Sequence, residues 1–299
     1  MDVSIIIVTY NTRQMTAECI ESVFQKTSDI DFEVILVDNA SSDGSKDFFE
    51  NDSRIKYIYS QENQGFGRAN NTGAEIAQGK YLFLLNSDTL LENNAVKQFY
   101  DFMENVDRKI ACCGCLLIND KNERIHSFGS FHNLTNSIME KCWLLERIRL
   151  LLRLSKTPKY DNPELDNGQS FFEVPFVTGA ALFVRKEVAD KYGLFDPDYF
   201  MYSEDMDLQY RYFKLGFKSV VIRTPQIVHL VGKSSKKGSI KKIEMNIKGL
   251  FTYMKKHNSW MYFEIFSILF KFLYSLSFSL SRSYSIKEKF SHIIAVQKL

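Results

Sequence analysis

The sequence is poor in the residues that mark specialised classes of protein. Its 299 residues include 5 prolines, 14 glycines and 5 cysteines, which excludes collagen-like and low-complexity chains. An excess of one charge is also lacking, because 38 basic residues stand against 36 acidic ones, for a net charge of +2. With 45% hydrophobic residues, the composition predicts one large globular domain or two smaller ones, each able to bury a core.

The cysteines are too few and too irregularly spaced for a disulfide framework. Cys112, Cys113 and Cys115 form a cluster, but no second pair stands at zinc-binding spacing, so we expect small buried core residues. The amino terminus, MDVSIIIVTYN, has an acid where a secretory signal has bases, and its apolar run is short. We therefore expect a reducing, cytoplasmic location.

Apolar runs alternate with helix-like segments over the first 118 residues. Strands are predicted at 3–10, 32–40, 55–61 and 80–88, and helices at 13–27 and 66–77. This alternation indicates βαβ units, so we predict a doubly wound, mainly parallel α/β sheet over residues 1–118. Ligands of such sheets bind at the carboxyl ends of the strands.

Polar residues directly follow three of these runs. They are Thr9, Tyr10 and Asn11, then Asp38 and Asn39, then Asn86, Ser87 and Asp88. Helix capping explains any one group, but three groups at neighbouring strand ends predict a binding edge. The chain lacks a GxGxxG motif after the first run and lacks GxxxxGK[ST], which disfavours dinucleotide and P-loop sites.

The second half of the chain gives a weaker pattern. Residues 143–156 fit either an ordinary surface helix or a basic amphipathic helix on a membrane. Residues 172–188 predict a strand, a turn, a second strand and the start of a helix. The acidic segment SEDMD precedes a helix predicted at 208–215, which Gly216 should end.

Six blocks of the sequence resemble, in order, those of family 2 glycosyltransferases, above all the rhamnosyltransferase-like branch that builds bacterial surface polysaccharides. The blocks are VSIIIVTYN, ILVDNASSDGS, ENQGFGRANNTGAEIAQGKYLFLLNSD, VTGAALFVRKEV, GLFDPDYFMYSEDMDLQYRYFKLGFK and VVIRTPQIVHLVGKSS. The resemblance implies a GT-A fold over 1–235, with a nucleotide-sugar-binding half at 1–118 and an acceptor-binding half at 119–235. It also implies inversion at the anomeric carbon.

The resemblance implies a dTDP- or UDP-linked sugar donor and a divalent cation, Mg²⁺ or Mn²⁺. Where the family has D-x-D, this chain reads Asn86-Ser87-Asp88, so Asp88 would be the main metal ligand. Asn86 would then bond the ribose or a metal-bound water, and Ser87 belongs to the same nucleotide site. His229, in VHLVG, matches a family position that binds metal or diphosphate, although a lone histidine at a strand end is often structural.

Further residues of the implied nucleotide site come from the first two blocks and the third. Thr9, Tyr10 and Asn11 would frame the base, and Asp38 would accept a hydrogen bond from the base or the ribose. Gly65 permits close backbone approach. Arg68 either neutralises a phosphate or is a solvated residue at the start of a helix.

Glu204 and Asp205 match the family's E-D motif. The resemblance implies that Asp205 is the general base that deprotonates the acceptor hydroxyl, with Glu204 orienting the acceptor or sharing that role. The alternative is that both acids only cap the following helix. Gly179, in the TGAA turn, would let the donor sugar pass close to the backbone.

The carboxyl-terminal tail, 236–299, differs from the rest of the chain in charge. Residues 233–299 carry 13 basic and 3 acidic residues, which leaves 25 basic and 33 acidic residues in 1–232. The apolar segment 262–281 fits a core helix, an interfacial helix beside anionic lipid or a membrane span. No nucleic-acid-binding motif accompanies the lysines, so we expect an anionic membrane surface and no nucleic acid as partner.

The sequence therefore predicts an inverting sugar transferase that acts on a saccharide or lipid-linked saccharide acceptor at the inner face of the cell membrane. Two alternatives stay open. One is a nucleotidyltransferase, although its glycine-rich signature after the first strand is replaced by TYNTRQ. The other is a non-catalytic nucleotide-sugar-binding module, which Glu204 and Asp205 disfavour.

Overall fold

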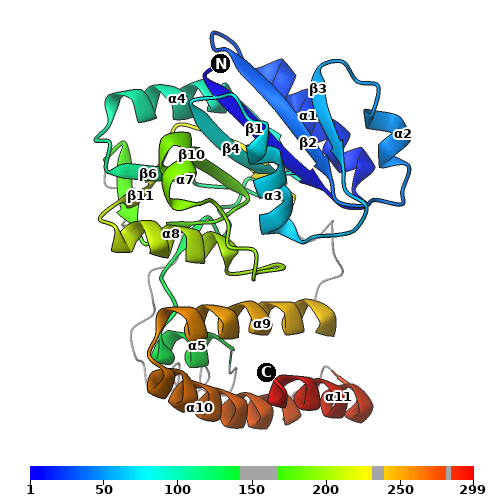
Figure 1. Ribbon diagram of the computed structural model, residues 1–299, viewed down its shortest axis with the longest axis vertical. Helices are drawn as coiled ribbons and strands as arrows, with labels where there is room; N and C mark the ends of the chain where they lie inside the picture. The colour runs from blue at the N-terminus through cyan, green and yellow to red at the C-terminus, as the bar shows by residue number, and fades with distance from the viewer. Residues whose placement is uncertain (142–167, 231–238, 281–283) are drawn as a thin grey trace. The chain divides into compact units, whose positions relative to one another are not determined.

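A computed structural model describes residues 1–141, 168–230, 239–280 and 284–299 (Figure 1). The predicted helix at 143–156 lies outside the described residues, as do Cys142 and residues 231–238. By its internal contacts the chain divides into two compact units. The first comprises 1–131, 160–200 and 204–236, and the second comprises 132–159, 201–203 and 237–299.

Strands alternate with helices in the first unit. The strands are β1 (Val3–Thr9), β2 (Phe32–Asp38), β3 (Ile55–Tyr59), β4 (Tyr81–Asn86), β5 (Thr89–Leu91), β6 (Ile110–Cys115), β7 (Phe128–Gly129), β8 (Phe171–Val174), β9 (Phe176–Val177), β10 (Ala181–Arg185), β11 (Lys218–Ile222) and β12 (Ile227–His229). The helices are α1 (Arg13–Lys26), α2 (Ser45–Phe49), α3 (Phe66–Glu75), α4 (Ala95–Asn105), α7 (Lys186–Tyr192) and α8 (Glu204–Lys214).

An eight-stranded sheet runs through this unit in the order β3-β2-β1-β4-β10-β6-β11-β8. β3, β2, β1 and β4 are parallel, as are β6 and β11, whereas β10 is antiparallel to both of its neighbours and β8 is antiparallel to β11. The predicted α/β fold with a mainly parallel sheet is confirmed. β10, from residues 181–185, lies between β4 and β6, so strands distant in the sequence share one continuous sheet.

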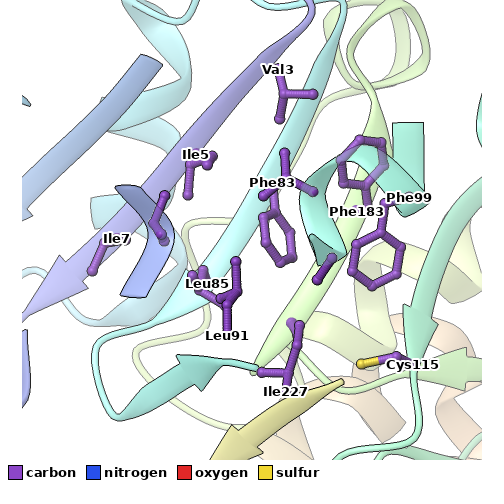
Figure 2. Close-up of a cluster of buried hydrophobic side chains, with 14 of the residues drawn as sticks. Val3, Ile5, Ile7, Phe83, Leu85, Leu91, Phe99, Cys115, Phe183 and Ile227 are labelled. Carbon is purple, nitrogen blue, oxygen red and sulfur yellow. The ribbon is translucent and has the colours of Figure 1, made fainter. Parts of the chain in front are cut away.

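The sheet is covered on both faces because successive strand residues point to opposite sides. Val3, Ile5 and Ile7 of β1 lie on one face, in a cluster completed by side chains of α1 and α4 (Figure 2). Ile6 lies on the other face, in a cluster with side chains of α3, α7 and α8. Both faces are therefore apolar, which leaves the strand ends as the polar part of the sheet.

The structure tests two further predictions, the burial of the cysteine cluster and the start of the helix after SEDMD. Cys112, Cys113 and Cys115 are buried in β6, as expected of small core residues. The helix predicted at 208–215 begins one turn earlier, at Glu204, so that prediction of its start is wrong. The acids that were expected to precede the helix form its first turn instead, where carboxylates interact favourably with the positive end of the helix dipole.

The second unit is helical in its described residues. It contains α5 (Leu134–Lys141), α9 (Ile240–His257), α10 (Trp260–Ser279) and α11 (Ile286–Gln297). Phe251 of α9 packs against Phe266 and Phe270 of α10, with ring centroids 5.2 and 5.3 Å apart. His292 of α11 is fully buried and lies 3.0 Å from both Glu244 and the hydroxyl of Tyr274, so it ties three helices together.

The face of α10 opposite to these contacts is apolar and exposed. Ile268 and Phe272 are each 66% exposed, and they belong to a stripe at helical spacing that comprises Met261, Ile265, Ile268, Leu269, Phe272 and Leu276. By length and composition alone, α10 is long and apolar enough to cross a bilayer, but buried core helices of soluble proteins meet the same criterion.

Candidate functional site

Three strand ends of the first unit meet at one edge of the sheet. The register places Thr9 beside Asp38 and Val8 beside Asn86, so the polar residues that end β1, β2 and β4 are neighbours. The carboxyl ends of parallel strands are the usual binding edge of such sheets. The structure thus brings together the three groups of polar residues that the sequence singled out; their role in binding remains a prediction.

A chain of hydroxyl groups supports this edge from inside. Thr9 is fully buried, and its Oγ1 lies 2.8 Å from that of Thr16 and 3.0 Å from that of Thr12. The Thr12 hydroxyl lies 3.1 Å from the hydroxyl of Ser87. These contacts join β1 and the start of α1 to the turn after β4. The buried hydroxyl of Thr9 therefore helps to hold these segments of the sheet edge together.

Tyr10 and Asn11 are the exposed residues of the edge. The Tyr10 residue is 49% exposed. Asn11 has a left-handed φ of 55°, which asparagine tolerates better than most residues. Its Oδ1 accepts hydrogen bonds from the backbone N–H and the hydroxyl of Ser42, and its own N–H donates to Oγ of Ser41. The loops that follow β1 and β2 are therefore tied together.

Asp38 is fully buried at the end of β2. Its Oδ1 accepts a hydrogen bond from the N–H of Ser41, and its Oδ2 accepts one from the hydroxyl of Tyr57, both at 2.8 Å. Burial and the neighbouring carboxylate raise the pKa of Tyr57, which keeps its hydroxyl protonated as a donor. Asp38 therefore holds the loop that carries Ser41 and thereby the exposed edge.

Asp88 and His229, both predicted metal ligands, lie side by side. The Oδ1 of Asp88 is 3.2 Å from Nε2 of His229, and both side chains are largely buried. Antiparallel pairing of β5 with β12 causes this proximity, since His229 pairs with Thr89 and the N–H of Leu230 donates to the carbonyl of Asp88 at 2.8 Å.

This pair offers a cation one carboxylate and one imidazole. Within the described residues, no group of three His, Cys, Asp or Glu side chains could hold a metal ion. A cation at Asp88 would need oxygen atoms of a bound phosphate or of water to complete its shell. Mg²⁺ is commonly bound in this way, through one or two carboxylates and substrate phosphates, so the residues present fit such an ion.

Gly65 and Arg68 contact the loop that precedes α8. Gly65 has a φ of +86°, and a Cβ there would lie 2.1 Å from the carbonyl oxygen of Phe200. The N–H of Phe66 donates to that carbonyl at 2.9 Å. Arg68 is exposed, and its Nε donates to the carbonyl of Pro197 at 2.8 Å. The backbone that closely approaches Gly65 is thus that of Phe200 in the same chain.

Glu204 and Asp205 open α8, and their side chains have different surroundings. Asp205 is half-buried; its Oδ2 accepts a hydrogen bond from the N–H of Gly179 and its Oδ1 one from the N–H of Met206, both at 2.8 Å. Glu204 is only 6% exposed, and its Oε2 has no hydrogen-bond donor among the described residues. A Cβ at Gly179 would lie 3.6 Å from that of Asp205, so the TGAA turn touches this acid directly.

The two acids hold protons more tightly than isolated carboxyl groups. Burial, followed by repulsion from Asp205, raises the pKa of Glu204 to about 8. Burial also raises the pKa of Asp205, while the N–H groups of Gly179 and Met206 and the charge of His126 oppose that rise. Strongly perturbed carboxyl pairs of this kind are typical of functional sites, where they supply acid or base chemistry.

Asp207, in the same turn, is used structurally. Its carboxylate is fully buried and is bonded at 3.1 Å by the hydroxyl of Tyr199 and at 2.8 Å by Nε of Arg211. The guanidinium of Arg211 also donates to the carbonyls of Tyr192 and Leu194. The ion pair with Arg211 thus makes Asp207 an anchor that holds α8 to the segment after α7.

Asn39, one of the polar residues that the sequence placed at the binding edge, supports a neighbouring loop, whereas His126 was not singled out by the sequence. Asn39 donates to Oδ1 of Asn63 and to the carbonyl of Gly65, and it accepts from the N–H of Gln64, so it fixes the loop before α3. His126 lies near enough to Asp205 to affect its pKa. No sequence pattern marks it, because only the fold brings 126 to 205.

Comparisons with known proteins agree on one family. The family model described as glycosyl transferase family 2 matches residues 4–193. Glycosyltransferase GlyG of Streptococcus pneumoniae is 28% identical over 36% of this chain and 37% of its own length. The putative glycosyltransferase EpsH of Bacillus subtilis is 37% identical over 32% of this chain and 28% of its own length. The matched region is thus about a third of the length of these relatives.

A solved structure shares the fold. GalNAc-T7, determined with UDP, GalNAc and Mn²⁺, superposes with a TM-score of 0.62 over 98% of this chain and 54% of its own, at 17% sequence identity. Identity this low supports the GT-A fold alone. The comparisons thus agree with the six blocks of the sequence on the family, whereas nothing in them distinguishes the rhamnosyltransferase-like branch.

Glu204→Gln should remove a pH dependence from the stability of the fold. Because the folded pKa of Glu204 is raised, its stabilising contribution is present below about pH 4.5 and is lost as the pH rises through about 8. Glutamine does not titrate, so the variant should gain roughly 3–5 kcal/mol relative to the wild type between pH 5 and pH 9. Urea unfolding at both pH values measures this change.

The matched control for that experiment is Glu187→Gln, an exposed acid in the first turn of α7. Its free energy of unfolding should follow the wild type at both pH values. If the curves of Glu204→Gln and wild type run parallel between pH 5 and pH 9, the pKa of Glu204 is not raised and the acid pair has no unusual proton affinity.

Proposed function

We propose that this chain, which belongs to glycosyl transferase family 2, transfers a sugar from a nucleotide-diphosphate donor to a hydroxyl group of a saccharide or lipid-linked saccharide. The reaction forms a bond between the acceptor oxygen and the anomeric carbon while the bond to the diphosphate breaks. Attack from the face opposite to the leaving group inverts the anomeric carbon, as the family resemblance implies. Its setting would be the synthesis of cell-surface polysaccharide.

One observation carries this proposal: a single turn links the strand ends to the acid pair. The N–H of Asn86 donates to the carbonyl of Ala180 at 3.0 Å, and the N–H of the preceding Gly179 donates to Asp205 at 2.8 Å. Asp88 stands two residues after Asn86. A donor whose diphosphate lies at Asp88 would therefore have its sugar directed toward the turn and Asp205.

Asp205 is the proposed general base. Its carboxylate is half-exposed and held by two backbone N–H groups, so it can meet an acceptor hydroxyl in a fixed orientation. Glu204 is buried, with no donor to Oε2 among the described residues, and burial and the charge of Asp205 raise its pKa to about 8, so near neutral pH it is protonated beside Asp205 and would orient the acceptor or share the proton transfer. A base whose pKa is raised toward neutral takes a proton more readily than an ordinary carboxylate.

Asp88 and His229 are the proposed holders of a divalent cation, either Mg²⁺ or Mn²⁺. Such an ion, when bound, supplies a Lewis acid that neutralises the charge developing on the departing diphosphate. Support comes from the 3.2 Å approach of the two side chains and from the Mn²⁺ present in the solved structure of GalNAc-T7. Asn86 and Ser87 would hold the ribose or a water next to the cation.

The nucleobase and the ribose of the donor are proposed to lie over the carboxyl ends of β1 and β2. Tyr10 and Asn11 offer the exposed contacts there, while Thr9 and Asp38 hold them in place from inside. The donor would be UDP- or dTDP-linked, and rhamnose is the sugar that the resemblance implies. Arg68, exposed at the start of α3, would add a positive charge near the phosphates through the nitrogens that Pro197 leaves free.

Asp205→Asn should abolish transfer and leave binding of the nucleoside diphosphate intact, because the base acts on the acceptor alone. Removal of a general base lowers kcat by about 100-fold or more. The rate is measured with a panel of UDP- and dTDP-linked sugars in the presence of Mn²⁺, and binding is measured by calorimetry. Glu204→Gln, measured alongside, should lower kcat less, since that acid acts through its neighbour.

Asp47→Asn is the matched control, an exposed carboxylate on α2 that should leave both quantities unchanged. Near-normal turnover of Asp205→Asn would remove this residue from the catalytic role. Equal loss of transfer and of nucleotide binding would instead make Asp205 part of the donor site.

We also propose that the second unit attaches the enzyme to the inner face of the cell membrane. The exposed stripe of α10 supplies apolar area, and α9 carries lysines at Lys241, Lys248 and Lys255, spaced to lie on one face. Stable peripheral binding needs two such signals. A surface-bound enzyme would suit an acceptor that is itself linked to lipid.

The double variant Ile268→Asp/Phe272→Asp should lose most of the salt-resistant binding to anionic vesicles. The wild type should bind them, be partly released in high salt as the lysine contribution is screened, and bind neutral vesicles weakly. Phe48→Asp, an aromatic residue 58% exposed on α2, is the control and should behave as wild type. Wild-type protein that ignores anionic vesicles, or a double variant that binds them equally, contradicts the membrane proposal.

A further inference from the structure

His126 lies opposite the turn that holds the proposed general base. β7 pairs with β9 in an antiparallel ladder. The ladder continues beyond both strands, because the N–H of Thr178 donates to the carbonyl of Ser127 at 3.0 Å. One step further, the same register places His126 opposite Gly179. Residues that face one another in such a ladder have Cα atoms about 5 Å apart.

The backbone beside His126 is fixed by a buried serine. The hydroxyl of Ser127 donates to the carbonyl of Ile125 and accepts from the N–H of Leu117, both at 2.8 Å. The imidazole ring lies beside Gly129, where a Cβ would come within 3.6 Å of Nε2. The position of His126 is therefore set by the ladder and by the residues on its carboxyl-terminal side.

Gly179 adjoins both His126 and Asp205. Its N–H donates to Oδ2 of Asp205 at 2.8 Å, and a Cβ at Gly179 would lie 3.6 Å from that of Asp205. All three residues belong to the first unit. Burial is the largest influence on the pKa of Asp205 and raises it, whereas the positive charge of His126 lowers it.

Other ionisable side chains on the elements around Asp205 belong to α8, to the segment before β7 and to α3. They are Glu204, Asp207 and Arg211 on α8, Arg124 before β7, and Arg68 on α3. Asp207 pairs with Arg211, and Arg68 donates to a backbone carbonyl. Because the pKa of Glu204 is about 8, that acid stays protonated in acidic solution. Histidine gains its charge between about pH 8 and pH 5, so His126 is cationic where a carboxyl group begins to take up protons.

We infer that His126 is a positioning residue for Asp205, placing a positive charge across Gly179 that keeps this carboxyl group ionised and able to take a proton from the acceptor. The inference rests on the proposed function, because it concerns the general base of that reaction. Burial favours the protonated form of Asp205, which cannot act as a base, and a nearby cation favours the ionised form. His126 would act on the base without touching donor or acceptor.

His126→Gln in the full chain tests this inference through the pH profile of kcat. Transfer is measured with Mn²⁺, a saccharide acceptor and the UDP- or dTDP-linked sugar that the wild type uses, all saturating. The acid limb of the profile reports ionisation of the base in the complex. Loss of one positive charge near the protein surface should move this limb to higher pH by about 0.5 to 1 unit. On the limb, kcat should therefore fall about 3- to 10-fold, and above it kcat should equal that of the wild type.

Two further variants separate the charge of His126 from its shape. His126→Lys keeps a positive charge, so its acid limb should lie at the wild-type position or at lower pH. Lys121→Gln is the matched control, because it removes an exposed cation from the same loop, where the backbone N–H of Lys121 keeps its bond to Asn119. Its profile should superpose on that of the wild type.

The outcomes separate this inference from the function on which it rests. If the wild type transfers no sugar from any donor of the panel, the proposed function fails and takes this inference with it. If the wild type is active and the profile of His126→Gln superposes on it, only the role of His126 is overturned. An equal loss of kcat at every pH, or an acid limb of His126→Lys displaced as far as that of His126→Gln, overturns it as well.

Discussion

The structure of the site depends on the insertion of β10 between β4 and β6. This antiparallel strand brings the turn at 178–180 to the edge where β1, β2 and β4 end. The N–H of Asn86 donates to Ala180, and Gly179 donates to Asp205. Two hydrogen bonds from one turn thus connect the strand-end residues to the acids of α8. The insertion therefore connects Asp88 and Asp205, which are far apart in the sequence, through the same turn.

In the candidate site, buried polar side chains hold in place the loops that carry the exposed polar residues. Thr9 and Asp38 are fully buried, and they hold the loops that carry Tyr10, Asn11 and Ser41. Glu204 is the exception, since its Oε2 is buried without a donor among the described residues. Leaving a buried polar atom unsatisfied costs stability, and the proposed acid–base role of Glu204 and Asp205 would account for that cost.

Much of the fold was predictable, because β-branched runs such as 3–10 and polar strand ends have clear signals. The proximity of Asp88 and His229 was implied only by the family resemblance, because β5 and β12, whose pairing creates it, lie far apart in the sequence. Two features had no local signal at all. The place of β10 in the sheet and the approach of His126 to Asp205 arise from tertiary packing, which periodicity along one chain does not encode. The start of α8 was misplaced because acids before an amphipathic segment fit either a cap or a first turn.

The most direct test of this account is a crystal structure of the full chain with Mn²⁺ and a non-hydrolysable analogue of its nucleotide-sugar donor. The account predicts that the cation lies within coordination distance of Asp88 and that the nucleobase lies over Tyr10 and Asn11. It also predicts that the anomeric carbon of the sugar faces the turn at Gly179 and Asp205. A nucleotide bound away from the ends of β1, β2 and β4, or a cation without contact to Asp88, would contradict it.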